Sequence, residues 1–172
     1  VPHKNRKRRK NTMEYADFIY LKQIYNIITK IVTEKFMKTI EIIYESNLRS
    51  KAIHVASGST LITDAPVDNH GKGETYSPTD LLCTALGTCI TTIIGIEANK
   101  LGIDLHKMKG TINKTMTTNP RRVALIEICL VLYGNFSENE QKQLYTSAVN
   151  CPVSLSLSSE VKQELNLTFS AI

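Results

Sequence analysis

The chain has 172 residues, of which 42% are hydrophobic and 22% charged, and it contains no tryptophan. This composition is that of a globular protein, and the length suits one domain with an ordinary core. No apolar run approaches the roughly 18–20 residues that a membrane helix needs, so a membrane protein is not expected.

The net charge of +5 would suit a nucleic-acid or anionic-membrane partner, but the excess positive charge is confined to one end of the chain. Residues 1–36 hold nine Lys/Arg and three Asp/Glu, a net charge of +6. Residues 37–172 hold twelve basic and thirteen acidic residues, a net charge of −1. The body of the protein is therefore close to neutral, and nucleic acid is not its expected partner.

Residues 1–36 differ from the rest and are predicted to be an N-terminal extension. Val1–Lys10 is a self-repelling basic run, for which we expect disorder. Apolar residues recur at helical spacing from Tyr15 to Phe36, which predicts an amphipathic helix. We interpret the extension as a tag or as upstream sequence translated before a true start at Met37, with residues 37–172 as the functional domain. The alternative is a nucleic-acid-binding arm that depends on Val1–Lys10 alone.

The body begins with strand patterns and leads into one long helix. Strands are predicted at residues 39–44, 51–56 and 60–63, and the loop 64–75 follows. Ser77 is a natural N-cap, Pro78 suits the first turn, Asp80 occupies the capping-box position, and Gly102 stops the helix. Because Ser77–Leu101 is apolar or small nearly all round, we expect it to be buried centrally.

The second half alternates again between strands and helices. Strands are predicted at residues 107–118, 123–133 and 161–169, a helix at 137–149, and a short helix after Cys151. This order of elements predicts an α+β fold with antiparallel sheets packed around the long helix.

The chain has four cysteines without CxxC or metal-ligand spacing, too few for a secreted disulfide scaffold. We therefore expect a reducing, cytoplasmic location. Cys151 precedes Pro152 at a predicted helix N-cap, where free N–H groups and the helix dipole favour a thiolate. The alternative is a small capping or buried residue. Cys129 lies within a predicted buried strand and is interpreted as packing.

Cys89 lies on the long helix and is either a functional thiol or an inert core residue. At helical spacing it shares a face with apolar residues, namely Leu82, Ala85, Leu86, Ile93 and Ile96, so it would suit an inert core position. Cys83 is not its partner within the helix, because six residues turn the helix by about 600° and leave the two on different sides.

Two segments resemble a known family. S-P-T-D-L-L-C-T-A-L-G-T-C and N-C-P-V-S-L-S-L are similar to the signature segments of the OsmC/Ohr family, thiol-dependent peroxidase-like proteins associated with osmotic and organic hydroperoxide stress. In that family a proline-initiated helix carries the first cysteine eleven residues after the proline, as Cys89 follows Pro78. The second cysteine heads a later helix, as Cys151 does. The resemblance runs from about Met37 to the C-terminus.

The resemblance implies an intertwined homodimer with central helices and a reaction at two thiols. Cys89 would attack a hydroperoxide and become a sulfenic acid, and Cys151 would resolve it as a disulfide. An external dithiol, a lipoyl protein in some members, would then reduce the disulfide. Neither a metal nor a prosthetic group is expected as cofactor.

The resemblance also assigns supporting roles. Arg49 is the best match by order to the arginine that stabilises the family's thiolate. The family's glutamate after the proline is replaced by Thr79, and Asp80 supplies an acid one residue later.

An apolar wall of Leu82, Leu86 and Ile93 around the thiol would favour organic over inorganic peroxide. The alternative function is non-catalytic: an OsmC-like protein that binds a small hydrophobic molecule, or one whose cysteines sense redox state.

Overall fold

In the computed structural model, residues 15–37 and 39–171 are described. Contacts divide the chain into two compact units, one of Val1–Glu45 with Ser50–Leu61 and one of Ser46–Arg49 with Ile62–Ile172. The basic run predicted at Val1–Lys10 lies outside the described residues. The predicted boundary at Met37 is a different division, and it stays a prediction.

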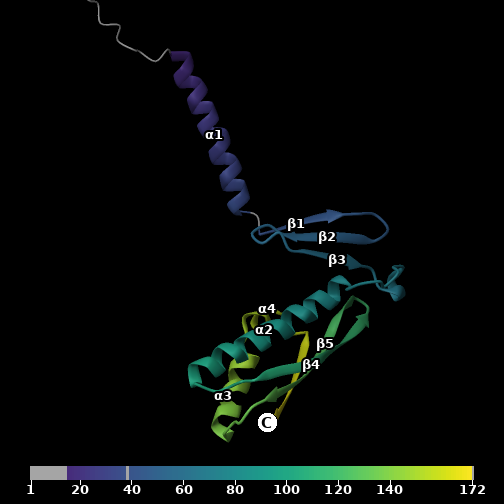
Figure 1. The fold of residues 1–172 in the computed structure, drawn as a ribbon. Helices are drawn as coiled ribbons and strands as arrows, with labels where there is room; N and C mark the ends of the chain where they lie inside the picture. The colour runs from purple at the N-terminus through teal and green to yellow at the C-terminus, as the bar shows by residue number, and fades with distance from the viewer. Residues whose placement is uncertain (1–14, 38, 172) are drawn as a thin grey trace, which may run out of the picture. The chain divides into compact units, whose positions relative to one another are not determined.

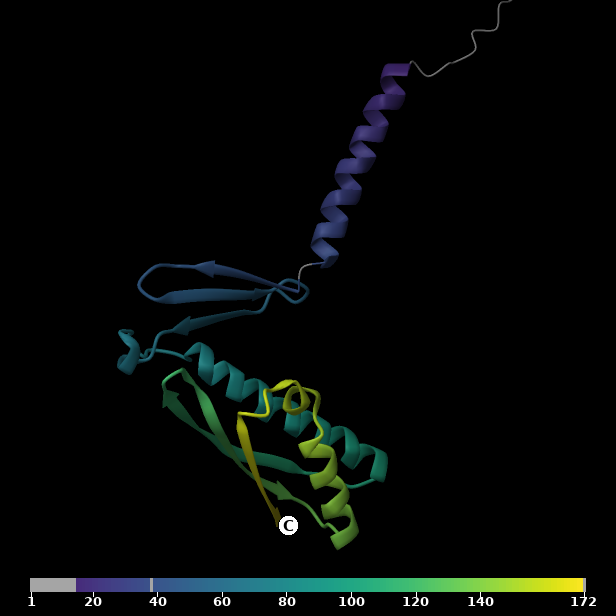
Figure 2. The ribbon, with the colours of Figure 1, turned by 180° about the vertical axis from the view of Figure 1, so that it is seen from behind.

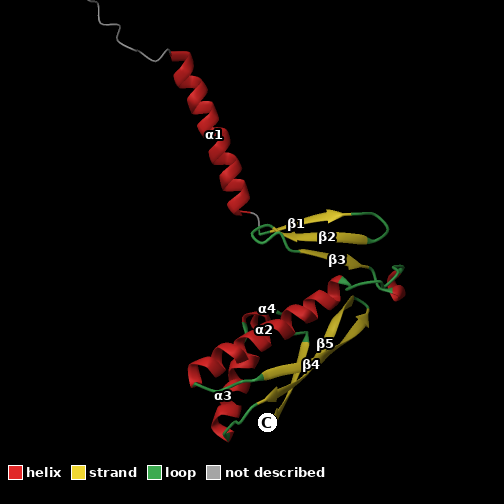
Figure 3. Ribbon diagram, in the orientation of Figure 1, coloured by secondary structure: helices red, strands yellow, loops and turns green. Residues whose placement is uncertain are grey.

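The first unit contains a helix and two paired strands. The helix α1 (Tyr15–Met37) forms as predicted, and apolar side chains along it, including Phe18 and Tyr25, are exposed. The strand β1 (Ile40–Tyr44) pairs antiparallel with β2 (Arg49–His54), with Ile40 opposite His54. The strand β3 (Thr60–Asp64) follows, and the order of this sheet is β1-β2-β3 (Figure 3).

The second unit contains a three-stranded sheet in the order β4-β5-β6 (Figure 1). Its elements are a 3-10 turn η1 (Val67–Asn69), the helices α2 (Pro78–Leu101), α3 (Glu138–Val149) and α4 (Pro152–Ser156), and the strands β4 (Lys107–Thr118), β5 (Arg121–Tyr133) and β6 (Lys162–Ser170). The α+β class and the order of elements are as predicted.

The direction of β6 differs from the prediction of antiparallel sheets. β4 and β5 form an antiparallel hairpin, but β6 pairs parallel to β5, with Leu125 opposite Lys162 and Tyr133 opposite Ser170. Parallel neighbours need a crossover connection, and α3 and α4 together supply it between β5 and β6.

The caps of α2 are those that the sequence predicts. The Ser77 hydroxyl accepts from the backbone N–H of Asp80, and the Asp80 carboxylate accepts from the N–H of Ser77. At the other end Gly102 adopts φ 67°, a left-handed conformation that a glycine takes without strain. These two caps fix where the helix begins and ends.

The helix α2 lies along the sheet β4-β5-β6 (Figure 2), and one stripe of its side chains packs into the core. Its buried members are Cys83, Leu86, Ile90, Ile94 and Ala98, which face buried residues of β5 such as Val123, Ile126, Ile128, Leu130 and Leu132. Gly87 lies on the same stripe, and a Cβ there would meet the Cδ1 of Ile112 on β4 at 2.2 Å. A larger residue here would therefore force the end of the Ile112 side chain to move.

The opposite face of α2 is not buried within the single chain, so the expected central burial of this face stays a prediction. Leu82 is 37% exposed and Ile96 is 46% exposed. The hydroxyls of Thr84, Thr88 and Thr92 each donate to the carbonyl four residues earlier, so they are satisfied by the helix itself. If another surface covered this outward face, these three threonine hydroxyls would keep their hydrogen bonds within the helix.

By length and composition alone, α2 could cross a membrane, contrary to the expectation from apolar runs. One third, 33%, of its most apolar 18-residue window is buried inside the protein. The core helix of a globular protein meets the same criteria, so this property is weak support for a membrane span.

Leu86→Ala should lower the free energy of unfolding by about 2–5 kcal/mol, because it removes a fully buried side chain and leaves a cavity. Val67→Ala, which shortens a side chain that is 74% exposed, should cost less than about 1 kcal/mol. Urea unfolding of both variants measures the difference. Equal losses would contradict the assigned burial of Leu86.

Candidate functional site

Cys89 and Cys151 come together in the second unit. Cys89 lies on α2 and is half-buried, whereas Cys151 is the N-cap of α4 and is fully buried. Cys89 lies close enough to Cys151 to contribute to the pKa of its thiol, and both cysteines are free. Packing of α4 against α2 therefore unites two cysteines that are 62 positions apart in the sequence.

The environment of Cys151 corrects one sequence expectation. Its position as N-cap is as predicted, and its Sγ accepts from the Ser154 N–H at 3.4 Å. Nevertheless, burial raises the pKa of the Cys151 thiol, and the neighbouring Cys89 adds to this rise. The N–H groups of Ser154 and Val153 lower the pKa but do not outweigh burial. The expectation of a favoured thiolate is therefore wrong, because sequence position showed the donors and not the loss of water.

The other two cysteines lie apart from the pair. Cys129 is exposed on β5, although it was expected to be packed, because its side chain points away from the core face of the strand. Cys83 is buried in the stripe of α2 that faces the sheet, and burial raises the pKa of its thiol. It lines an open cavity of about 580 Å³ beside Asp80 and Lys114.

Arg49 contacts carboxylates at the start of β2. Its guanidinium donates to Asp64, at 3.4 Å, and to Glu74. Asp64 is almost fully buried, and the backbone N–H of Glu74 is the main cause that holds the pKa of this carboxyl low, with Arg49 also contributing. The role of Arg49 at the thiols stays a prediction, because its described contacts are with these two acids.

The turn that precedes Arg49 is conformationally unusual. Ser46, Asn47 and Leu48 adopt φ values of 70°, 50° and 63°, which are left-handed values that non-glycine residues rarely take in succession. The N–H of Arg49 donates to the Ser46 carbonyl at 3.0 Å, which closes the turn. This turn thus fixes where β2 begins, with Arg49 as its first residue.

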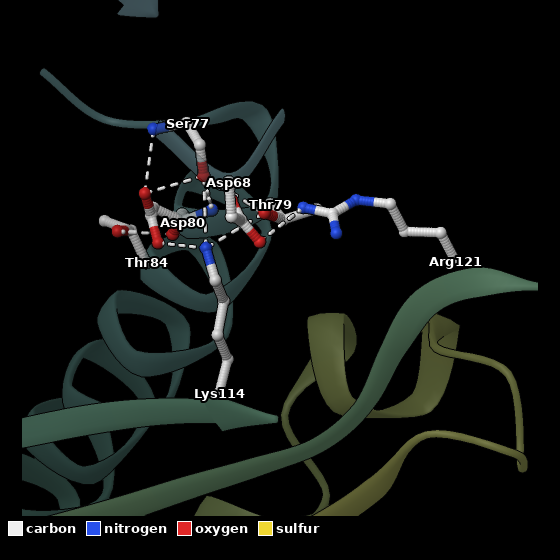
Figure 4. A network of polar contacts seen from close by, with 7 residues as sticks. All are labelled: Asp68, Ser77, Thr79, Asp80, Thr84, Lys114 and Arg121. Carbon is white, nitrogen blue, oxygen red and sulfur yellow. Dashed lines mark hydrogen bonds and ion pairs between the residues drawn. The ribbon is translucent and has the colours of Figure 1, made fainter. Parts of the chain in front are cut away.

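Asp80 belongs to a polar network at the start of α2 (Figure 4). Lys114 of β4 donates to Ser77 at 3.1 Å, to Thr79 at 2.9 Å and to the Asp80 carboxylate. Burial alone would raise the pKa of Asp80, but the hydrogen bonds from Lys114 and Ser77 outweigh it and leave the pKa low. Thr79 stands where the family that the sequence resembles has a glutamate. The Thr79 hydroxyl accepts a hydrogen bond from Lys114.

The distance along α2 separates Asp80 from the thiol pair. Nine residues of straight helix span about 13 Å, so Asp80 does not contact Cys89 within the chain. A catalytic role for Asp80 stays a prediction, while its role as helix cap is established by its contacts.

Sequence reasoning missed Lys114, although a signal was present. Met108, Ile112, Lys114 and Met116 alternate along β4 on the side that faces the core, so a lysine at this position needs a buried partner. The partner is the cap of α2.

The three apolar residues expected around the thiol differ in burial, and the wall that they were expected to form stays a prediction. Leu86 is fully buried and lines a cavity of about 200 Å³ between α2, α3, α4, β5 and β6, together with Ile90 and Ile128. Leu82 points outward and Ile93 is half-buried. Spacings of four and seven residues keep the three on one side of α2, and contact with the rest of the chain decides how far each is covered.

In the described part of the chain no group of three or more His, Cys, Asp or Glu side chains could hold a metal ion. The His54 ring forms a hydrogen bond with the Ser57 hydroxyl, and the His106 ring contacts the Asp104 carboxylate. Both histidines are exposed.

A family model described as OsmC-like protein matches residues 71–166, which is more than half of the chain and includes both cysteines. The chain belongs to the OsmC-like family. Among curated proteins no match was found.

Solved structures of OsmC-like proteins share the fold. One from Psychrobacter arcticus, described as an osmotic stress induced and detoxification response protein, is 41% identical, with a TM-score of 0.73 over 76% of this chain and 96% of that chain. An organic hydroperoxide resistance protein OsmC from Legionella pneumophila is 19% identical, with a TM-score of 0.57 over 77% and 98%. OhrB of Bacillus subtilis, also an organic hydroperoxide resistance protein, is 16% identical, with a TM-score of 0.54 over 76% and 98%.

Asp80→Asn should lower the free energy of unfolding at pH 7, because it removes the charge that Lys114 and the first turn of α2 bind. The native pKa of Asp80 is low, so its stabilisation is present above the unfolded value of about 3.9 and is lost as pH falls through the native value.

The deficit of Asp80→Asn should therefore shrink on acidification below about pH 4, as measured by urea unfolding across pH. Glu97→Gln, in the exposed pair at the other end of α2, is the control and should change stability little. A pH-independent deficit would show that the charge is not what matters.

Proposed function

We propose that this OsmC-like protein reduces organic hydroperoxides with Cys89 as the peroxidatic and Cys151 as the resolving thiol. The observation that carries the proposal is the contact between the two thiols, one half-exposed and one fully buried. Relatives of the same fold bear the name of organic hydroperoxide resistance, which supports this substrate class.

The chemistry balances at each step. The Cys89 thiolate attacks the O–O bond, which yields an alcohol and a sulfenic acid at Cys89. Cys151 attacks the sulfenic sulfur, which forms the disulfide and releases water. An external dithiol then reduces the disulfide to two thiols and is itself oxidised to a disulfide. The half-exposed Cys89 suits the step that meets substrate, and the buried Cys151 suits the internal step.

In the proposed reaction Arg49 is the residue that would stabilise the Cys89 thiolate. Arg49 would support the thiolate only after leaving Asp64 and Glu74, the two acids it contacts. This engagement favours a second candidate, a redox sensor that oxidises at the same pair and turns over slowly. The two functions differ in rate and not in the residues that react.

Replacement of each cysteine tests the proposed reaction. With an alkyl hydroperoxide and a dithiol, Cys89→Ser should reduce peroxide loss to the uncatalysed background, because no other thiol contacts Cys151 in its place. Without the dithiol, Cys151→Ser should complete one turnover and accumulate a sulfenic acid at Cys89, trapped by a 1,3-dione and read by mass spectrometry. Cys129→Ser, which alters an exposed cysteine, should match wild type. Wild-type loss no faster than that of Cys89→Ser would refute a peroxidase.

We propose further that two copies of the chain pair through the outward face of α2. Leu82 and Ile96 are exposed there, and the threonine hydroxyls between them are satisfied within the helix. Such a face loses little hydration of polar groups when a second copy covers it.

Ile96→Glu should shift the protein from twice 19.3 kDa to 19.3 kDa in sedimentation equilibrium, because it buries an unpaired charge in the proposed interface. Gln143→Glu places the same charge on an exposed position of α3 and should leave the dimer intact. A wild-type protein that sediments as one copy at micromolar concentration would overturn the pairing.

A further inference from the structure

Two hydrogen bonds join α4 to β6. The Ser154 hydroxyl donates to the side-chain oxygen of Gln163 at 2.7 Å, and the Gln163 amide nitrogen donates to the Ser154 carbonyl at 3.2 Å. One glutamine thus acts as acceptor and donor toward the same residue, which fixes the direction of its amide. We call this pair the Ser154–Gln163 clamp.

The clamp acts on the residue that contacts the buried thiol. The backbone N–H of Ser154 donates to the Sγ of Cys151 at 3.4 Å. α4 has only five residues, and a helix of about one turn does not hold its own shape in water. Val153 and Leu157 pack against the core and set the depth of α4, whereas the clamp fixes its rotation at Ser154.

We infer that Gln163 is a positioning residue for Cys151, which acts through Ser154 by keeping that N–H directed at the sulfur. The inference rests on the proposed function, in which the Cys151 thiolate attacks an oxidised Cys89. As the attack begins, the negative charge on Cys151 is stabilised by the donors that already face it. Without the clamp α4 can turn, and the donor is lost for part of the time.

The attack by Cys151 can be measured without any hydroperoxide. An aromatic disulfide, 5,5′-dithiobis(2-nitrobenzoate), reacts with Cys89 to form a mixed disulfide and one thionitrobenzoate. Cys151 then attacks the Cys89 sulfur, forms the internal disulfide and releases a second thionitrobenzoate. Absorbance resolves a bimolecular first phase and a unimolecular second phase. The full chain with Cys129→Ser removes the exposed competitor.

Gln163→Leu should slow the second phase about fivefold and leave the first phase unchanged, because only Cys151 depends on the clamp. Ser154→Ala, which loses one of the two bonds, should slow it less, and Ser154→Thr should keep the wild-type rate. Gln141→Leu is the matched control, since Gln141 also donates to a backbone carbonyl, that of Phe136, and should change neither phase.

Each outcome decides the inference. An unchanged second phase in Gln163→Leu, or an equal slowing of both phases, overturns the role of Gln163. A wild-type protein without a second phase overturns it as well, because Cys151 then does not attack Cys89. A clamp-dependent second phase in a protein that consumes no hydroperoxide supports the inference and refutes the peroxidase.

Discussion

The burial of one stripe of α2 against the sheet β4-β5-β6 is the interaction on which the site depends. It orients the helix, and the orientation decides that Cys83 and Leu86 face the core while Cys89 lies at the border of the buried stripe. α4 can then bring Cys151 to the same border from the other end of the chain. The thiol pair is thus a consequence of helix packing, and Gly87 is the residue that permits the close approach.

The chemistry of the buried thiol reflects two opposed effects. Removal of water disfavours the charged sulfur of Cys151, and the N–H groups of Ser154 and Val153 favour it. Burial has the larger effect, so the raised pKa keeps the Cys151 thiol mainly in its neutral form at neutral pH. A neutral thiol protects the partner cysteine from premature disulfide exchange, and it needs donors in place when charge develops. The same logic explains why a short helix next to the thiol is tied to a strand.

The sequence predicted most of the fold and singled out the two cysteines that the structure brings together, because these leave local signals. Ser77, Asp80 and Gly102 mark the ends of α2 by rules that involve only neighbouring residues. Partners across the fold leave weaker signals, and the contact of Lys114 with the cap was not predicted. Neither were the parallel direction of β6 and the net effect of burial on Cys151, since both depend on how elements pack after they form.

The complete burial of Cys151 also sets an order of events in the proposed reaction. Of the two thiols in the pair Cys89 is the less buried, so the oxidant and the reductant must both reach the pair through the same entrance, at Cys89. They cannot occupy it together, and each must leave before the other enters. The kinetics of such a protein are ping-pong, and an excess of either reactant competes with the other at a single sulfur atom.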